Sequence, residues 1–99
     1  MNVAAFKASL SGAAPAPGLP APLAGLWWAA KGDWDRAHGI VQDDGTRNAA
    51  WVHAYLHRVE GDLSNAGYWY GKAGQTTAKD SLQAEWERIA STLLEGSTP

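Results

Sequence analysis

The stretch that decides the fold is residues 50–73, AWVHAYLHRVEGDLSNAGYWYGKA. It contains two segments with helical character on either side of Glu60-Gly61-Asp62. Gly61 breaks the first segment, because glycine readily takes the left-handed conformation that reverses a chain after a helix. Asp62 is a favoured residue type for capping the helix that follows. We therefore predict two helices joined by a tight turn, with the second helix ending at about Ala73.

A near-copy of this turn lies earlier in the chain. Residues 31–37 read KGDWDRA and residues 60–66 read EGDLSNA, and the two turn glycines, Gly32 and Gly61, are 29 residues apart. A repeat of this length in helical sequence favours stacked helical hairpins. We expect the first hairpin to consist of helices at about 22–31 and 34–42, and we expect Asn48 to cap the first helix of the second hairpin.

The two ends of the chain flank these hairpins. Residues 2–11 are expected to form a short helix capped by Asn2, and the proline-rich residues 13–22 an extended connector. A last helix is expected to be capped by Asp80 or Ser81 and to end at Gly96. It carries a one-sided apolar stripe, which consists of Leu82, Trp86, Ile89, Ala90, Leu93 and Leu94.

The predicted fold is therefore all-α. Residues 1–22 form a short helix and a Pro/Ala-rich connector, and residues 23–96 form a single helical domain of two stacked antiparallel hairpins with a C-terminal capping helix. We expect Trp86 of that capping helix to lie against the fifth helix, over Gly67 or Gly71. We also expect Glu85 and Glu87 to lie on solvated sides of the last helix.

The hairpins resemble tetratricopeptide-type repeats, and residues 66–73 resemble the second helix of their short Sel-type relatives. The first unit matches the repeat pattern at Gly25, Trp28, Gly32-Asp33-Trp34 and Ala37, with Val41 in place of an aromatic residue, and the second at Ala54, His57, Gly61-Asp62-Leu63, Ala66, Tyr70 and Ala73. The resemblance covers roughly residues 21–73 and implies a non-catalytic module for protein–protein interaction. The repeat is shorter than the roughly 34-residue tetratricopeptide period.

Composition narrows the possible functions. The net charge is −2 and the basic residues are scattered, which argues against nucleic-acid binding. No apolar run approaches the ~20 residues that span a membrane, and no signal-peptide pattern opens the chain, so we predict a cytoplasmic protein. The chain has no cysteine, which removes disulfides and cysteine zinc sites. No cofactor-binding motif is present, so we predict no cofactor.

His53 and His57 are spaced to project from one helix face, with Glu60 nearby. This set suits a small metal-dependent or acid–base enzyme, with His38 as a further ligand from the neighbouring helix. The glutamate that follows the first histidine in zinc peptidases is absent. The preferred interpretation is a packed His57 whose ring nitrogen bonds to the backbone or to a carboxylate, and no bound metal is predicted.

Six tryptophans are too many for complete burial in a chain of this length. Trp27, Trp51 and Trp69 are the tryptophans least expected to lie in the core. A predicted binding site for a protein or peptide partner, or for a second copy of the chain, consists of Trp51, Tyr55, Tyr68 and Trp69, rimmed by Arg58 and Lys72. The alternative is that these aromatic residues cover the edge of the core or the proline-rich connector.

Overall fold

The computed structural model describes residues 1–96, and every regular element within them is helical. The elements are α1 (Val3–Ala8), the 3-10 turn η1 (Ser9–Ser11), α2 (Ala21–Ala30), α3 (Trp34–Val41), α4 (Arg47–Val59), α5 (Leu63–Ala73) and α6 (Leu82–Gly96). The predicted all-α class is confirmed. None of the helices in these residues is both long and apolar enough to cross a membrane.

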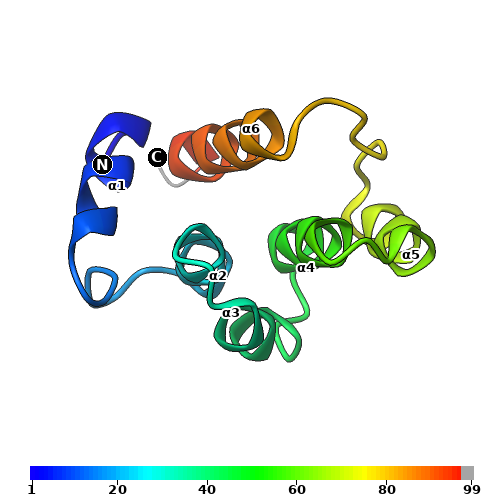
Figure 1. Cartoon of the computed structure of the whole chain (residues 1–99), viewed down its shortest axis with the longest axis horizontal. Coiled ribbons are helices and arrows are strands. Elements are labelled where there is room, and N and C mark those ends of the chain that lie inside the picture. The colour runs from blue at the N-terminus through cyan, green and yellow to red at the C-terminus, as the bar shows by residue number, and fades with distance from the viewer. Residues whose placement is uncertain (97–99) are drawn as a thin grey trace.

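Helix α4 is the centre of the arrangement. It contacts α2, α3, α5 and α6, whereas α1, which continues directly into η1, packs on α6 (Figure 1). The nine consecutive residues Ala49–His57 are all buried. A helix that is surrounded on all sides buries its polar residues together with its apolar ones, and this brings His53 and His57 into the interior.

The two helix-to-helix turns have the same local geometry. Gly32 and Gly61 take left-handed φ values of 81° and 85°. The side chains of Asp33 and Asp62 then accept hydrogen bonds from the backbone N–H groups of Arg36 and Asn65, each at 3.2 Å. The sequence repeat is therefore a structural repeat at the turns, and both turns lie where the glycines predict them.

The cap predicted for α4 lies two residues from the observed one, whereas the cap of α6 is one of the two residues predicted for it. Thr46 caps α4 in place of Asn48, because its hydroxyl accepts from the backbone N–H of Ala49 at 3.1 Å. Ser81 accepts from the backbone N–H of Ala84 at 3.0 Å at the start of α6. The Asp80 carboxylate bonds to Arg88 at 2.5 Å. Asn2 caps α1 as predicted.

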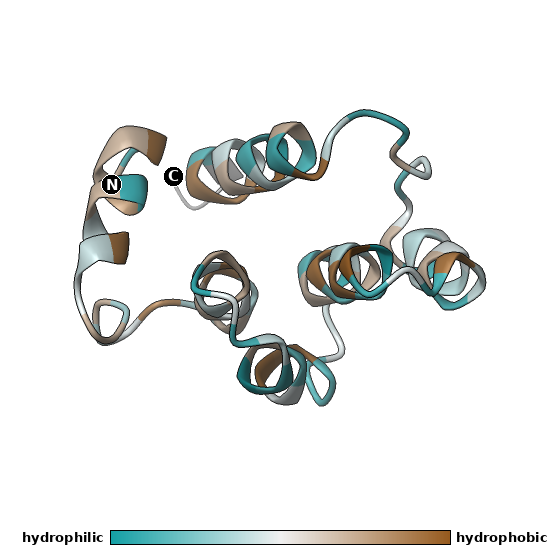
Figure 2. Cartoon of the chain, in the orientation of Figure 1, coloured by the Kyte–Doolittle hydropathy of each residue, from teal (hydrophilic) through white to brown (hydrophobic). Residues whose placement is uncertain are grey.

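The core contains two tryptophans that were not expected to be buried there. Trp27 is completely buried and Trp51 is 5% exposed. The indole N–H of Trp27 donates to the Ser9 hydroxyl at 3.0 Å, so the N-terminal segment provides its polar partner. Figure 2 shows hydrophobic and hydrophilic bands alternating on the helices, as expected where each buries one side.

Helix α6 covers a different surface from the one predicted. Its Trp86 donates an indole hydrogen bond to the Leu26 carbonyl at 2.9 Å and stacks on Phe6, with ring centroids 5.7 Å apart. A methyl group built on Gly67 or Gly71 of α5 would meet nothing within 4 Å. The expectation that Trp86 lies over these glycines is wrong, because α6 packs on α1, α2 and α4.

The prediction for Glu85 is also wrong, because its side chain is completely buried rather than solvated. Arg58 donates to one Glu85 oxygen at 2.9 Å, and the Tyr70 hydroxyl donates to the other at 2.5 Å. Burial and this hydrogen bond raise the pKa of Tyr70. Arg58 also bonds to the Asp80 carbonyl. Glu85 thus links α4, α5 and α6.

Candidate functional site

Three histidines meet between α3 and α4. His38 comes from α3, and His53 and His57 come from successive turns of α4. One ligating nitrogen from each ring lies within 4.8 Å of the other two. The ring centroids are 4.6 Å apart for His38 and His53, 5.5 Å for His38 and His57, and 4.9 Å for His53 and His57. The chain has no other histidine.

Two tryptophans enclose this cluster. Trp34 stacks on His38 with ring centroids 4.7 Å apart, and Trp69 stacks on His53 at 3.9 Å. The indole N–H of Trp34 donates to the Leu56 carbonyl at 2.7 Å, which fixes its ring against α4. His53 and His57 are 4% and 6% exposed, whereas His38 is only half-buried. Solvent therefore approaches the cluster from the His38 side.

The surroundings disfavour charge on two of the three rings. Burial, together with smaller contributions from the neighbouring His38 and His57, lowers the pKa of His53 to about 4. Burial and His57 also lower the pKa of His38. Both rings are consequently neutral near pH 7 and keep a nitrogen lone pair, which is the form that accepts hydrogen bonds or binds metal ions.

His53 and His57 differ in their hydrogen bonding. His57 Nδ1 bonds to the Glu60 carboxylate at 2.7 Å. This contact is the one expected for a packed histidine, and Glu60 therefore touches His57 rather than the centre of the cluster. His53 Nδ1 is buried and has no hydrogen-bond partner within residues 1–96. A buried polar atom without a partner costs free energy and calls for an explanation.

The six residues predicted as a partner site do not form one surface. Trp51 and Tyr55 are buried in the core, and Arg58 forms an ion pair with Glu85. The remaining three come from α5, where Tyr68 and Lys72 are exposed and Trp69 is half-buried. The sequence pattern misses this division because it does not reveal that α4 is covered on every side.

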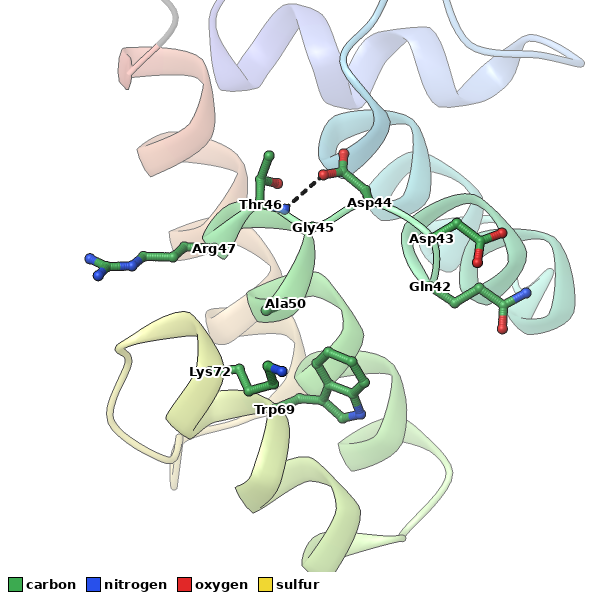
Figure 3. Close-up of a pocket in the computed structure, with 9 residues that line it drawn as sticks. All are labelled: Gln42, Asp43, Asp44, Gly45, Thr46, Arg47, Ala50, Trp69 and Lys72. Atoms are coloured by element: carbon green, nitrogen blue, oxygen red, sulfur yellow. Dashed lines mark hydrogen bonds between the residues drawn. The ribbon is translucent and has the colours of Figure 1, made fainter.

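A hollow of about 210 Å³ adjoins Trp69 and Lys72, between α5 and the loop that joins α3 to α4. Trp69 and Lys72 line it from α5, and the loop contributes Asp43 and Asp44 (Figure 3). The Asp44 carboxylate accepts from the backbone N–H of Thr46 at 2.9 Å. Trp69 therefore separates the hollow from the histidine cluster.

Comparisons with family models, with curated proteins and with solved structures found no match to this chain. Its function therefore has to be inferred from its own geometry.

Proposed function

We propose that the chain is a non-catalytic interaction or scaffold module of tetratricopeptide-like hairpins, with a protein or peptide as its partner. The observation that carries the proposal is the aromatic pair Tyr68 and Trp69 on α5, of which Tyr68 is exposed and Trp69 is half-buried. Tyr68 is 59% exposed, and its ring meets that of Trp69 edge-on at a centroid distance of 5.3 Å. The cytoplasmic location of the protein stays a prediction from the sequence.

The repeated turn supports the hairpin part of this proposal. Gly32-Asp33 and Gly61-Asp62 reverse the chain in the same way, and each turn joins two helices that pack on each other. Small residues lie where the paired helices meet, since Ala37 is completely buried and Ala66 is 1% exposed. Stacked hairpin repeats form extended surfaces that bind partners.

The chemistry of the α5 surface suggests the kind of partner. Lys72 Nζ lies 5.5 Å from the Tyr68 ring centroid and 5.8 Å from that of Trp69, and it makes no ion pair within residues 1–96. Aromatic side chains with one exposed edge are enriched at protein interfaces. We propose that the partner places an apolar side chain on Tyr68 and Trp69 and a carboxylate on Lys72.

Selection of a displayed random peptide library tests this proposal. Peptides enriched on the wild-type chain are measured by fluorescence polarisation against Tyr68→Ala, Lys72→Ala and Leu63→Ala. Leu63 is 68% exposed on the same helix but is not part of the proposed binding surface, so it is the matched control. We expect the first two variants to weaken binding about tenfold, as for residues that anchor an interface. Equal affinity in all four proteins would overturn the proposal.

A metal-dependent or acid–base enzyme that uses His53, His57 and Glu60 is the second candidate. The convergence of the histidines within 4.8 Å favours it. It ranks lower because His53 and His57 are 4% and 6% exposed, which leaves a substrate access only from the His38 side. Hydrolysis of an activated ester with added Zn²⁺ tests it, and identical rates for wild type and His53→Gln would rule it out.

A further inference from the structure

We propose that His38, His53 and His57 together bind one divalent transition-metal ion such as Zn²⁺, and that this ion holds α3 against α4. The site has a structural role and does not depend on the interaction surface of α5. It differs from the enzyme hypothesis in its ligands, because His38 replaces Glu60 as the third ligand.

The ligand set has the composition and spacing that such ions need. Imidazole nitrogens bind Zn²⁺, Cu²⁺ and Ni²⁺, and three histidines with an open fourth position form a known type of zinc site. Two of the ligands are four residues apart on α4, so they project from one face. The third comes from α3, which packs on that face. Both supporting elements are helices, which position ligands better than loops do.

A small movement brings the nitrogens into the geometry of a bound ion. Zn–N bonds of ~2.0–2.1 Å place tetrahedral ligands about 3.3 Å apart. The three nitrogens now lie within 4.8 Å of one another, so the rings must turn inward. His38 is half-buried and can rotate most easily. Solvent on its side of the cluster supplies a water as the fourth ligand.

The unpartnered nitrogen of His53 is the second observation that points to a ligand. His53 is 96% buried, as its exposure is 4%, and its Nδ1 has no hydrogen-bond partner in the described part of the chain. Trp69 and His57 cover the two faces of its ring, with centroids at 3.9 and 4.9 Å. A metal ion between the three rings supplies the interaction that these packed side chains cannot.

Glu60 acts as a positioning residue for this site. Its carboxylate lies 2.7 Å from His57 Nδ1, which leaves Nε2 of that ring as the ligating atom. Metal-bound histidines commonly donate their other N–H to a carboxylate, which fixes the ring and makes the ligand more basic. Asp62 serves a different purpose, since its carboxylate caps α5.

The test is a titration of the metal-free chain with Zn²⁺ by calorimetry and with Co²⁺ by visible absorption, near neutral pH. We expect one equivalent of each ion, a tetrahedral Co²⁺ spectrum and a higher melting temperature with Zn²⁺. Glu60→Gln should weaken binding roughly 10–100-fold and His38→Gln by more than that. Of the three ligands, His38 is the least buried, so His38→Gln is the histidine variant most expected to fold.

Asp43→Asn is the matched control, because Asp43 is an exposed carboxylate in the loop after α3 that could bind ions weakly. It should leave the affinity unchanged. The proposal is overturned if the wild-type chain binds no Zn²⁺ at millimolar concentration, or if His38→Gln and Asp43→Asn bind it equally well. Circular dichroism of the metal-free variants shows whether a loss of binding reflects loss of the fold. If His38→Gln does not fold, the Zn²⁺ affinity of His53→Gln is measured in its place.

Discussion

Gly25 of α2 and Val41 of α3 are in such close contact that a methyl group on Gly25 would lie 2.6 Å from Val41 Cγ1. The Ala37 carbonyl oxygen and a methyl group of Val52 would lie 3.4 and 3.6 Å from the same position. Gly25 is therefore a point at which α2 lies very close to its neighbours, and its lack of a side chain permits α2 and α3 to pack together.

Gly25→Ala should destabilise the protein by about 1–3 kcal/mol, because the added methyl group overpacks this contact. Urea denaturation followed by tryptophan fluorescence measures the effect. The matched control is Gly71→Ala in α5, where the added methyl group meets nothing within 4 Å. That variant should be stabilised by about 0.4–1 kcal/mol, since alanine restricts the unfolded chain. Destabilisation of both variants to the same extent would contradict the close contact.

Gly61→Val should cost about 1–2 kcal/mol or more, since φ at this position is 85° and a left-handed conformation is unfavourable for residues with a β-carbon. Nothing lies within 4 Å of the added β-carbon, so the cost comes from the backbone and not from a clash. Gly45→Val is the comparison, because Gly45 does not have positive φ. The midpoint of chemical denaturation should fall only in the Gly61 variant, and equal midpoints would refute the turn geometry.

Arg58→Ala should destabilise the protein by about 3–5 kcal/mol, because it leaves the buried Glu85 carboxylate without its cationic partner. Tyr70→Phe should cost about 1.5–3 kcal/mol through loss of one hydrogen bond to the same carboxylate. Thermal and urea unfolding of both variants check this order. Lys7→Ala removes an exposed ion pair with Glu87 and should leave the midpoint almost unchanged. A larger effect of Lys7→Ala than of Arg58→Ala would contradict the buried role of Glu85.

The metal-free protein should lose stability as the pH falls from about 6.5 toward 4. The pKa of His53 is about 4 in the folded chain, below its ordinary value of 6.5, so the unfolded chain binds the proton more tightly across this interval. His38 acts in the same direction, since its pKa is also lowered. Urea midpoints measured with a chelator present at several pH values follow this loss.

His53→Phe keeps an aromatic ring against Trp69 and removes the titrating group. The loss of stability between pH 6.5 and 4 should be smaller in this variant than in the wild type. The other charged or titratable groups near the ring, His38, His57 and Glu60, are the same in both proteins. Parallel pH profiles would show that protonation of His53 is not responsible for the loss.

The positions of the helices follow closely from local sequence. Gly32, Gly61 and the aspartates after them predict both turns, and Gly74 ends α5 at Ala73 as expected. A cap or a left-handed glycine involves contacts within about four residues, which the sequence contains. The shift of the α4 cap from Asn48 to Thr46 lies within this same local range, because both residues are suitable caps.

The candidate site is only partly predictable. The spacing of His53 and His57 places them on one face, and the sequence raises His38 and Glu60 as neighbours. Glu85 was misassigned, although its position three residues after Leu82 and four before Ile89 places it on the apolar stripe of α6. That signal favours burial, and Arg58, the partner that makes burial possible, is 27 residues away in the chain.

The sequence by itself determined which segments are helices and where the chain turns, because caps, glycine conformations and helical periodicity act between close neighbours in the chain. Only the tertiary structure decided which faces are covered. It enclosed α4 on every side, buried Trp51 and Tyr55, placed Trp86 on α1 and α2, and brought His38 to His53 and His57. These outcomes depend on how distant helices stack, and an amphipathic stripe shows that a face is buried without showing what buries it.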